Sequence, residues 1–124
     1  MTSTIRSFDV EFRLRAARLA EQAFLVSAVG ELDLTTAPEL SQTMAALDGR
    51  HARRLIVDLT EVTFLDSTAL GTLLAEARSR RAGGDELVLV CDDPRTLRAL
   101  EVTGLRAVFE VHRTLRDALD GAAR

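Results

Sequence analysis

Two short apolar runs separated by a helical segment most constrain what this chain can fold into. Residues 55–59 read LIVDL and residues 87–91 read LVLVC. Near-continuous apolar runs of this length are typical of central strands that are covered on both faces. Between them, apolar residues recur at helical spacing in Leu70, Leu73, Leu74 and Ala77. Strands that alternate with helices predict crossover connections and a mostly parallel sheet.

The N-terminal part of the chain predicts two more strands. FDVEFRL (8–14) alternates apolar and polar residues with the period of a half-buried strand near a sheet edge. AFLVSAVG (23–30) is short and mostly apolar, which suits a second strand. The two are expected to pair as a hairpin across RAARLAEQ (15–22), a linker that could also hold a helical turn. This hairpin would make the sheet mixed.

Capping signals place helices between the remaining strands. Thr36 with Glu39 three residues later has the spacing of a capping box, and an N-cap Asp93 is followed by Pro94 at the first helical position. The four helices are expected to begin near Thr36, Ser67, Asp93 and Thr114. AVFEV (107–111) predicts a last strand. The predicted order is therefore β-β-α-β-α-β-α-β-α, an α/β domain that spans residues 1–124 with helices packed on a mixed sheet.

Composition excludes several classes of function. The chain has 124 residues, 47% of them hydrophobic, and a net charge of −3, which does not suggest a nucleic-acid-binding protein. All 16 basic residues are arginine, so a P-loop or a Schiff-base site has no lysine. No secretory signal or membrane-spanning run is found, and a cytoplasmic protein is expected. The single cysteine, Cys91, is expected to be buried. Neither His51 nor His112 lies in a catalytic or metal-binding motif, so no catalytic residue, metal or cofactor is expected.

Three small polar residues, Asp66, Ser67 and Thr68, stand where a predicted buried strand gives way to a helix. Any one of them could cap the helix. One cap needs only one residue, however, and ligands and partners favour this edge of an open α/β sheet. A phosphate on Ser67 would add about −1.5 to −2 of charge beside Asp66. The pattern leaves two interpretations open, a helix cap and a phosphorylation switch.

Other carboxylates are also candidates for a site. Glu31 and Asp33 follow the second predicted strand, either in a solvated turn or on a rim shared with Ser67. Asp58, inside LIVDL, has the position of a response-regulator phosphoacceptor, but that chemistry also requires a lysine, which this chain lacks. Asp58 is therefore expected to bond to the backbone.

Three segments resemble the STAS-domain family and, more narrowly, bacterial anti-sigma-factor antagonists. They are GELDLTTAPEL (30–40), LIVDLTEVTFLDSTALGTLL (55–74) and LRALEVTGLRAVFEVHRTLRDAL (97–119), within a match over about residues 23–120. The resemblance implies a protein that binds an anti-sigma factor, often a serine kinase, and so releases a sigma factor. It also implies that the kinase phosphorylates the serine after the Asp, which is Ser67 here, and that a PP2C-type phosphatase reverses the modification.

We expect the partner face to comprise six residues, this serine and five polar residues near it. They are Glu31, Asp33, Thr35, Asp66, Ser67 and Thr68. The chain departs from the family at Ala69, where glycine is frequent, and the added methyl is expected where a kinase must approach.

Two alternatives to a phosphorylated antagonist stay open. One is a STAS scaffold or ligand sensor in a larger assembly that acts without phosphorylation. The other is a small enzyme with Asp58 or Asp66 as nucleophile, which the missing lysine disfavours. The leading expectation is a regulatory protein that is not an enzyme, does not bind nucleic acid or membranes, and is a monomer or weak homodimer.

Overall fold

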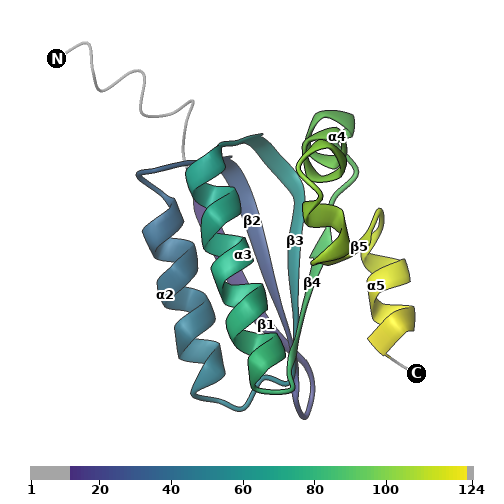
Figure 1. Ribbon diagram of the computed structural model, residues 1–124. Coiled ribbons are helices and arrows are strands. Elements are labelled where there is room, and N and C mark those ends of the chain that lie inside the picture. The colour runs from purple at the N-terminus through teal and green to yellow at the C-terminus, as the bar shows by residue number, and fades with distance from the viewer. Residues whose placement is uncertain (1–11, 123–124) are drawn as a thin grey trace, which may run out of the picture.

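A mixed sheet forms the centre of the molecule in the computed structural model, which describes residues 12–122 (Figure 1). Within this range five strands pair in the order β1-β2-β3-β4-β5. β1 is antiparallel to β2, and all later neighbours are parallel. The mixed, mostly parallel sheet is thereby confirmed. The strands are Arg13–Ala20, Ala23–Leu32, Arg54–Leu65, Glu86–Val90 and Glu110–His112.

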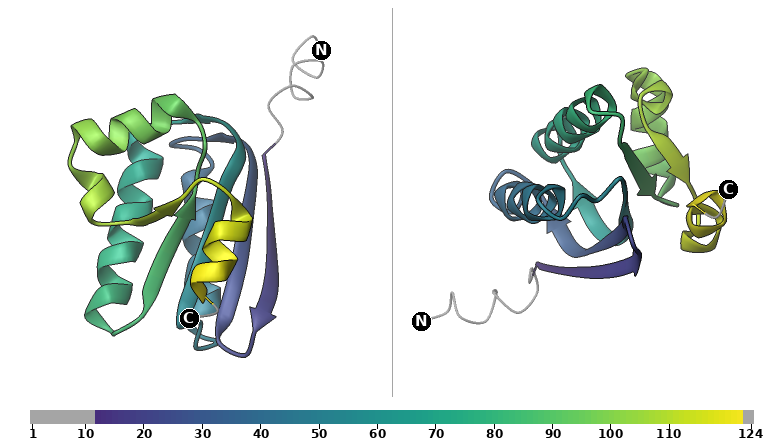
Figure 2. Two further views of the ribbon diagram at one scale, coloured as in Figure 1. Left: turned by 90° about the vertical axis from the view of Figure 1, so that its right-hand side faces the viewer. Right: turned by 90° about the horizontal axis from the view of Figure 1, so that it is seen from below.

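Helices cover both faces of this sheet. Figure 2 shows α2 and α3 on one face and α5 on the other, while α4 lies at the end of the sheet where β3 and β4 finish. The helix beginnings expected at Ser67, Asp93 and Thr114 are confirmed, since Asp93 and Thr114 accept hydrogen bonds from first-turn N–H groups. The helices are α2 (Ala37–Asp48), α3 (Ser67–Ala82), α4 (Pro94–Val102), the 3₁₀-helix η1 (Leu105–Ala107) and α5 (Leu115–Ala122).

The apolar run of β3 is buried on both faces, as its sequence predicts. Leu55, Val57 and Leu59 belong to the main core beneath α2 and α3. Ile56 points the other way and packs with Ala118 of α5 in a smaller cluster. Because both faces of β3 are covered, nearly all of its residues in this run are apolar. The different clusters on the two faces fix the register of β3 against its neighbouring strands.

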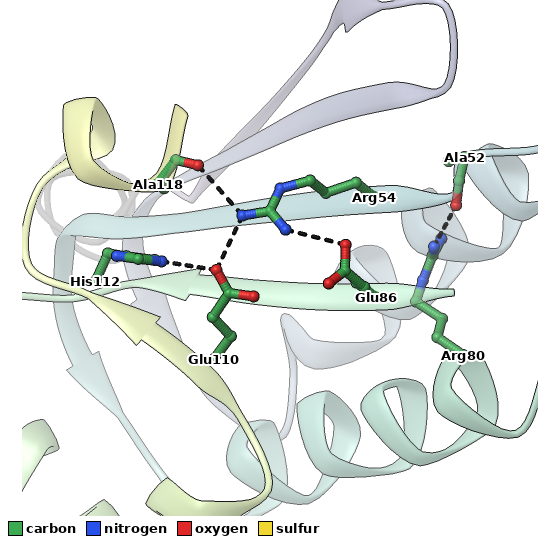
Figure 3. A network of polar contacts seen from close by, with 7 residues as sticks. All are labelled: Ala52, Arg54, Arg80, Glu86, Glu110, His112 and Ala118. Carbon is green, nitrogen blue, oxygen red and sulfur yellow. Dashed lines mark hydrogen bonds and ion pairs between the residues drawn. The ribbon is translucent and has the colours of Figure 1, made fainter. Parts of the chain in front are cut away.

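A polar network ties α5 and three strands together (Figure 3). The guanidinium of Arg54 donates to Glu86 at 3.0 Å, to Glu110 at 2.9 Å and to the carbonyl of Ala118 at 3.3 Å. Nε2 of His112 lies 2.7 Å from the same Glu110 carboxylate. The network lies at the starting ends of β3 and β4, away from the ends where α3 and α4 begin.

The first strand differs from the sequence-based prediction. The strand expected at residues 8–14 lies mostly outside the described residues, and the supposed linker 15–22 supplies most of β1, with the turn at Glu21 and Gln22. β1 is an edge strand with largely exposed side chains, so no apolar alternation marks it. The last strand is also shorter than 107–111, because η1 occupies residues 105–107 and β5 begins at Glu110.

Candidate functional site

The candidate site lies where β2 and β3 end side by side. Leu32 pairs with Leu65, and the backbone N–H of Asp66 donates to the carbonyl of Leu32 at 3.2 Å. The loop after β2 therefore lies directly against the start of α3. The structure brings the acidic turn of Asp33 and the Asp66-Ser67-Thr68 segment onto one rim.

Asp66 is the N-cap of α3 and also joins the two loops. One of its carboxylate oxygens accepts from the N–H of Ala69 at 2.9 Å, and the other accepts from the N–H of Leu34 at 3.2 Å. The first contact satisfies an otherwise unpaired donor of the helix start. The second fixes the β2–α2 loop beside it.

The hydroxyls of Ser67 and Thr68 are not used in this cap. Both residues are exposed on the first turn of α3, and within residues 12–122 neither side-chain oxygen has a hydrogen-bond partner. Capping alone therefore explains Asp66 but gives no reason for the two residues after it. Ala69 is fully buried, so the expectation that its methyl meets an approaching kinase is wrong: the methyl packs in the core.

The turn after β2 is organised by Asp33. Its carboxylate accepts from the N–H and the hydroxyl of Thr35, at 2.9 and 2.7 Å, and the hydroxyl contact is the main cause that holds the pKa of Asp33 below its ordinary value. The expected capping box is wrong. Thr36 is the N-cap position of α2, but its hydroxyl donates to the carbonyl of Glu31 at 2.8 Å and caps no N–H of the helix. The hydroxyl of Thr36 is used within the turn instead of capping α2. Among the described residues, the Glu39 side chain makes no reciprocal capping bond.

A pocket of about 380 Å³ opens beside Ser67, between the start of α3 and α4. Phe64 and Leu70 give it an apolar wall, and Arg95 with Thr96 forms the opposite side. Sequence reasoning missed both Phe64 and Arg95 as site residues. Phe64 follows the apolar pattern of a strand end, and only its exposed fraction of 52% shows that it faces solvent.

A second apolar side chain is exposed at the same rim. Leu34, in the loop that Asp66 holds, is 68% exposed. A contiguous exposed apolar patch bordered by polar residues is typical of a surface that binds another protein. In the sequence, Leu34 is an apolar residue within an otherwise polar turn.

The other candidate residues have structural roles. Asp58 accepts from the N–H and the hydroxyl of Thr60, at 2.9 and 2.7 Å, which confirms the expected backbone bond. Cys91 is buried, as expected. In the part of the chain that the structure describes, no group of His, Cys, Asp and Glu side chains could hold a metal ion. Among the same residues, no helix is long and apolar enough to cross a membrane.

Known proteins that resemble this chain agree with one another. The model of the STAS domain family matches residues 15–118. The anti-sigma-B factor antagonist of Listeria monocytogenes is 37% identical over 82 residues, which are 66% of this chain and 72% of that protein. The protein of the same name from Staphylococcus aureus is 29% identical over 92 residues, which are 74% of this chain and 85% of that one. A crystal structure of an anti-sigma factor antagonist from Mycobacterium paratuberculosis is 30% identical, with a TM-score of 0.82 over 92% of this chain and 96% of that one.

Proposed function

The chain belongs to the STAS-domain family, and from that membership and the geometry around Ser67 we propose that it is an anti-sigma-factor antagonist. In this proposal the protein binds an anti-sigma factor and thereby releases a sigma factor for transcription. The names of relatives at 37% and 30% identity support it. The proposed unit is one cytoplasmic domain over residues 1–124 that regulates by binding and catalyses no reaction itself.

The observation that carries the proposal is the exposed hydroxyl of Ser67, which has no hydrogen-bond partner in the part of the chain that the structure describes, beside a cap that Asp66 already supplies. In the proposed switch, the anti-sigma factor acts as a serine kinase with ATP. Ser67 Oγ forms a bond to the γ-phosphorus, the bond from that phosphorus to the β–γ bridging oxygen breaks, ADP leaves, and the hydroxyl proton is released. A PP2C-type phosphatase hydrolyses the ester and restores the serine.

The modification would change the charge of the rim without disturbing the fold. A phosphoserine carries about −1.5 to −2 of charge at pH 7, and the Ser67 hydroxyl makes no hydrogen bond to the described residues that the modification would break. The proposed partner face comprises the exposed apolar side chains Leu34 and Phe64 together with the polar residues that surround Ser67. Those polar residues are Glu31, Asp33, Thr35, Asp66 and Thr68.

Paired substitutions at Ser67 test this function. Ser67→Ala and Ser67→Asp baits are used to capture proteins from the host lysate, and a captured ATPase is then purified and titrated against both. We expect Ser67→Ala to bind at least as well as the parent and Ser67→Asp to lose tenfold or more in affinity, about 1.4 kcal/mol.

The matched control is Ser79→Asp, which adds the same charge to an exposed serine near the other end of α3. It should bind like the parent. Equal binding by the Ala and Asp variants at position 67 would contradict the switch.

The pocket beside Ser67 favours one alternative, a STAS module that senses a small ligand without being phosphorylated. A space of about 380 Å³ with an apolar wall is of the size that small-molecule sites have. This alternative predicts that Ser67 purified from host cells carries no phosphate and that a ligand is retained, both of which mass spectrometry of the intact protein detects.

A further inference from the structure

Ser67 and Arg95 face the same pocket from different elements. Ser67 is the first residue of α3, and Arg95 lies in the first turn of α4, which begins after β4. The pocket of about 380 Å³ lies between them. A group attached to Ser67 therefore lies beside a pocket that Arg95 also lines.

The charges around this pocket are unevenly distributed. Of its described lining residues, Asp66 and Asp93 are acidic and Arg95 alone is cationic. The Asp66 carboxylate already accepts from two N–H groups, and Asp93 caps α4 by accepting from the N–H of Arg95 at 3.0 Å. A further negative group in this space would meet two carboxylates and a single guanidinium.

Arg95 is free to bind such a group. Its side chain is 84% exposed, and its one ion pair, to Asp93, spans 3.5 Å, among the described residues. Charge-assisted hydrogen bonds are usually about 2.7–2.9 Å long, so this contact is weak. A guanidinium has several N–H donors and binds phosphate with a planar fork, so Arg95 can hold a second acceptor.

From this arrangement we propose that Arg95 binds the phosphate of phosphorylated Ser67 across the pocket. The inference rests on the proposed function only in taking Ser67 as the modified residue. The phosphate adds about −1.5 to −2 of charge next to Asp66 and Asp93, and Arg95 offsets it. Arg95 touches the modified group and acts as its receptor within the same chain.

This contact gives phosphorylation a second effect on the partner face. A phosphate held between α3 and α4 places negative charge in a pocket whose apolar wall includes Phe64 and Leu70. The modification thus changes the charge of the rim and the polarity of the pocket beside it. The positive charge of Arg95 favours the dianionic form of the phosphate and so lowers its second pKa.

The test uses the full chain with phosphoserine installed at position 67 during translation, so that no kinase or partner is needed. The phosphate is titrated by ³¹P NMR in the parent, in Arg95→Gln and in Arg98→Gln. Arg98 is the matched control because it is exposed on the same helix and does not line the pocket. We expect Arg95→Gln to raise the second phosphate pKa by about 0.5 unit, the size that an exposed ion pair gives, and Arg98→Gln to leave it within about 0.1 unit.

The inference is overturned if Arg95→Gln leaves the phosphate pKa unchanged, or if both variants shift it equally, since the effect is then absent or only long-range. Thermal melting of the unmodified variants shows whether both keep the parent's stability. Because the phosphate is introduced without a kinase, failure here leaves the antagonist function standing. Conversely, loss of the difference between Ser67→Ala and Ser67→Asp in partner binding contradicts that function and not the contact with Arg95.

Discussion

At the scale of single residues, the three adjacent polar side chains Asp66, Ser67 and Thr68 have different roles. Asp66 takes the whole structural role, because one carboxylate caps α3 through Ala69 and holds the neighbouring loop through Leu34. Ser67 and Thr68 are left with exposed hydroxyls. Modification of the Ser67 hydroxyl is therefore expected to leave the free energy of unfolding almost unchanged. Loss of the Asp66 carboxylate would break two hydrogen bonds.

Asp66→Ala should therefore destabilise the protein more than Ser67→Ala. We expect the free energy of unfolding to fall by about 1–2 kcal/mol for Asp66→Ala, the usual cost of a lost N-cap, and by less than about 0.5 kcal/mol for Ser67→Ala, as for an ordinary surface change. Urea unfolding followed by circular dichroism measures both. Similar losses in the two variants would mean that the serine shares the capping role.

At the scale of elements, periodicity predicted what is buried and missed what is exposed. The helical stripe of Leu70, Leu73, Leu74 and Ala77 and the run of β3 pack in the core as expected, because burial imposes the apolar pattern. β1 has no such pattern, since an edge strand is held mainly by backbone bonds to β2. The candidate site could be placed from strand ends and polar spacing, but Phe64 and Arg95 could not, because their roles depend on how α4 lies over the end of β3.

Arg80 shows the same limit within one helix. Its position in the last turn of α3 suggests a surface charge that favours the helix dipole. In the structure it is buried: it donates to the carbonyl of Ala52 and to the carboxylates of Glu76 and Asp48 (Figure 3 shows the contact with Ala52). The sequence shows three arginines there, Arg78, Arg80 and Arg81, and nothing in their spacing singles out the buried one.

Arg80→Met should accordingly be costly although it keeps an apolar stem of similar length. It leaves the Ala52 carbonyl and the Glu76 carboxylate without their partner, and we expect a loss of about 2–4 kcal/mol in unfolding free energy. The value lies below that of a fully buried pair because Asp48 is partly exposed. Arg78→Met, at an exposed position of the same helix, should stay within about 0.5 kcal/mol of the parent. Equal effects in chemical denaturation would show that burial of Arg80 contributes nothing.

At the scale of the whole molecule, the buried polar networks and the proposed partner face lie at opposite ends of the sheet. The polar networks of Arg54 and Arg80 lie at the N-terminal ends of β3 and β4, where they join strands to helices. The C-terminal ends of β2 and β3, where α3 begins, carry Ser67, Leu34 and Phe64. Because Leu34 and Phe64 are exposed, they contribute little to the free energy of unfolding. Substitutions at these positions can therefore change partner binding while the protein stays folded.

Leu34→Ser and Phe64→Ser should each weaken binding to the anti-sigma factor while the protein stays folded. Removal of an apolar contact at an interface costs about 1–3 kcal/mol, which corresponds to a loss of about fivefold to 150-fold in affinity. The N–H of residue 34 still reaches Asp66 in Leu34→Ser, so the loop remains in place. Leu19→Ser is the control, since Leu19 is also an exposed leucine but lies on β1, away from Ser67. Calorimetric titration of the purified partner gives the affinities and thermal melting gives the stabilities. If Leu19→Ser weakens binding as much as the two rim variants, or if neither rim variant weakens it, the partner face lies elsewhere on the molecule.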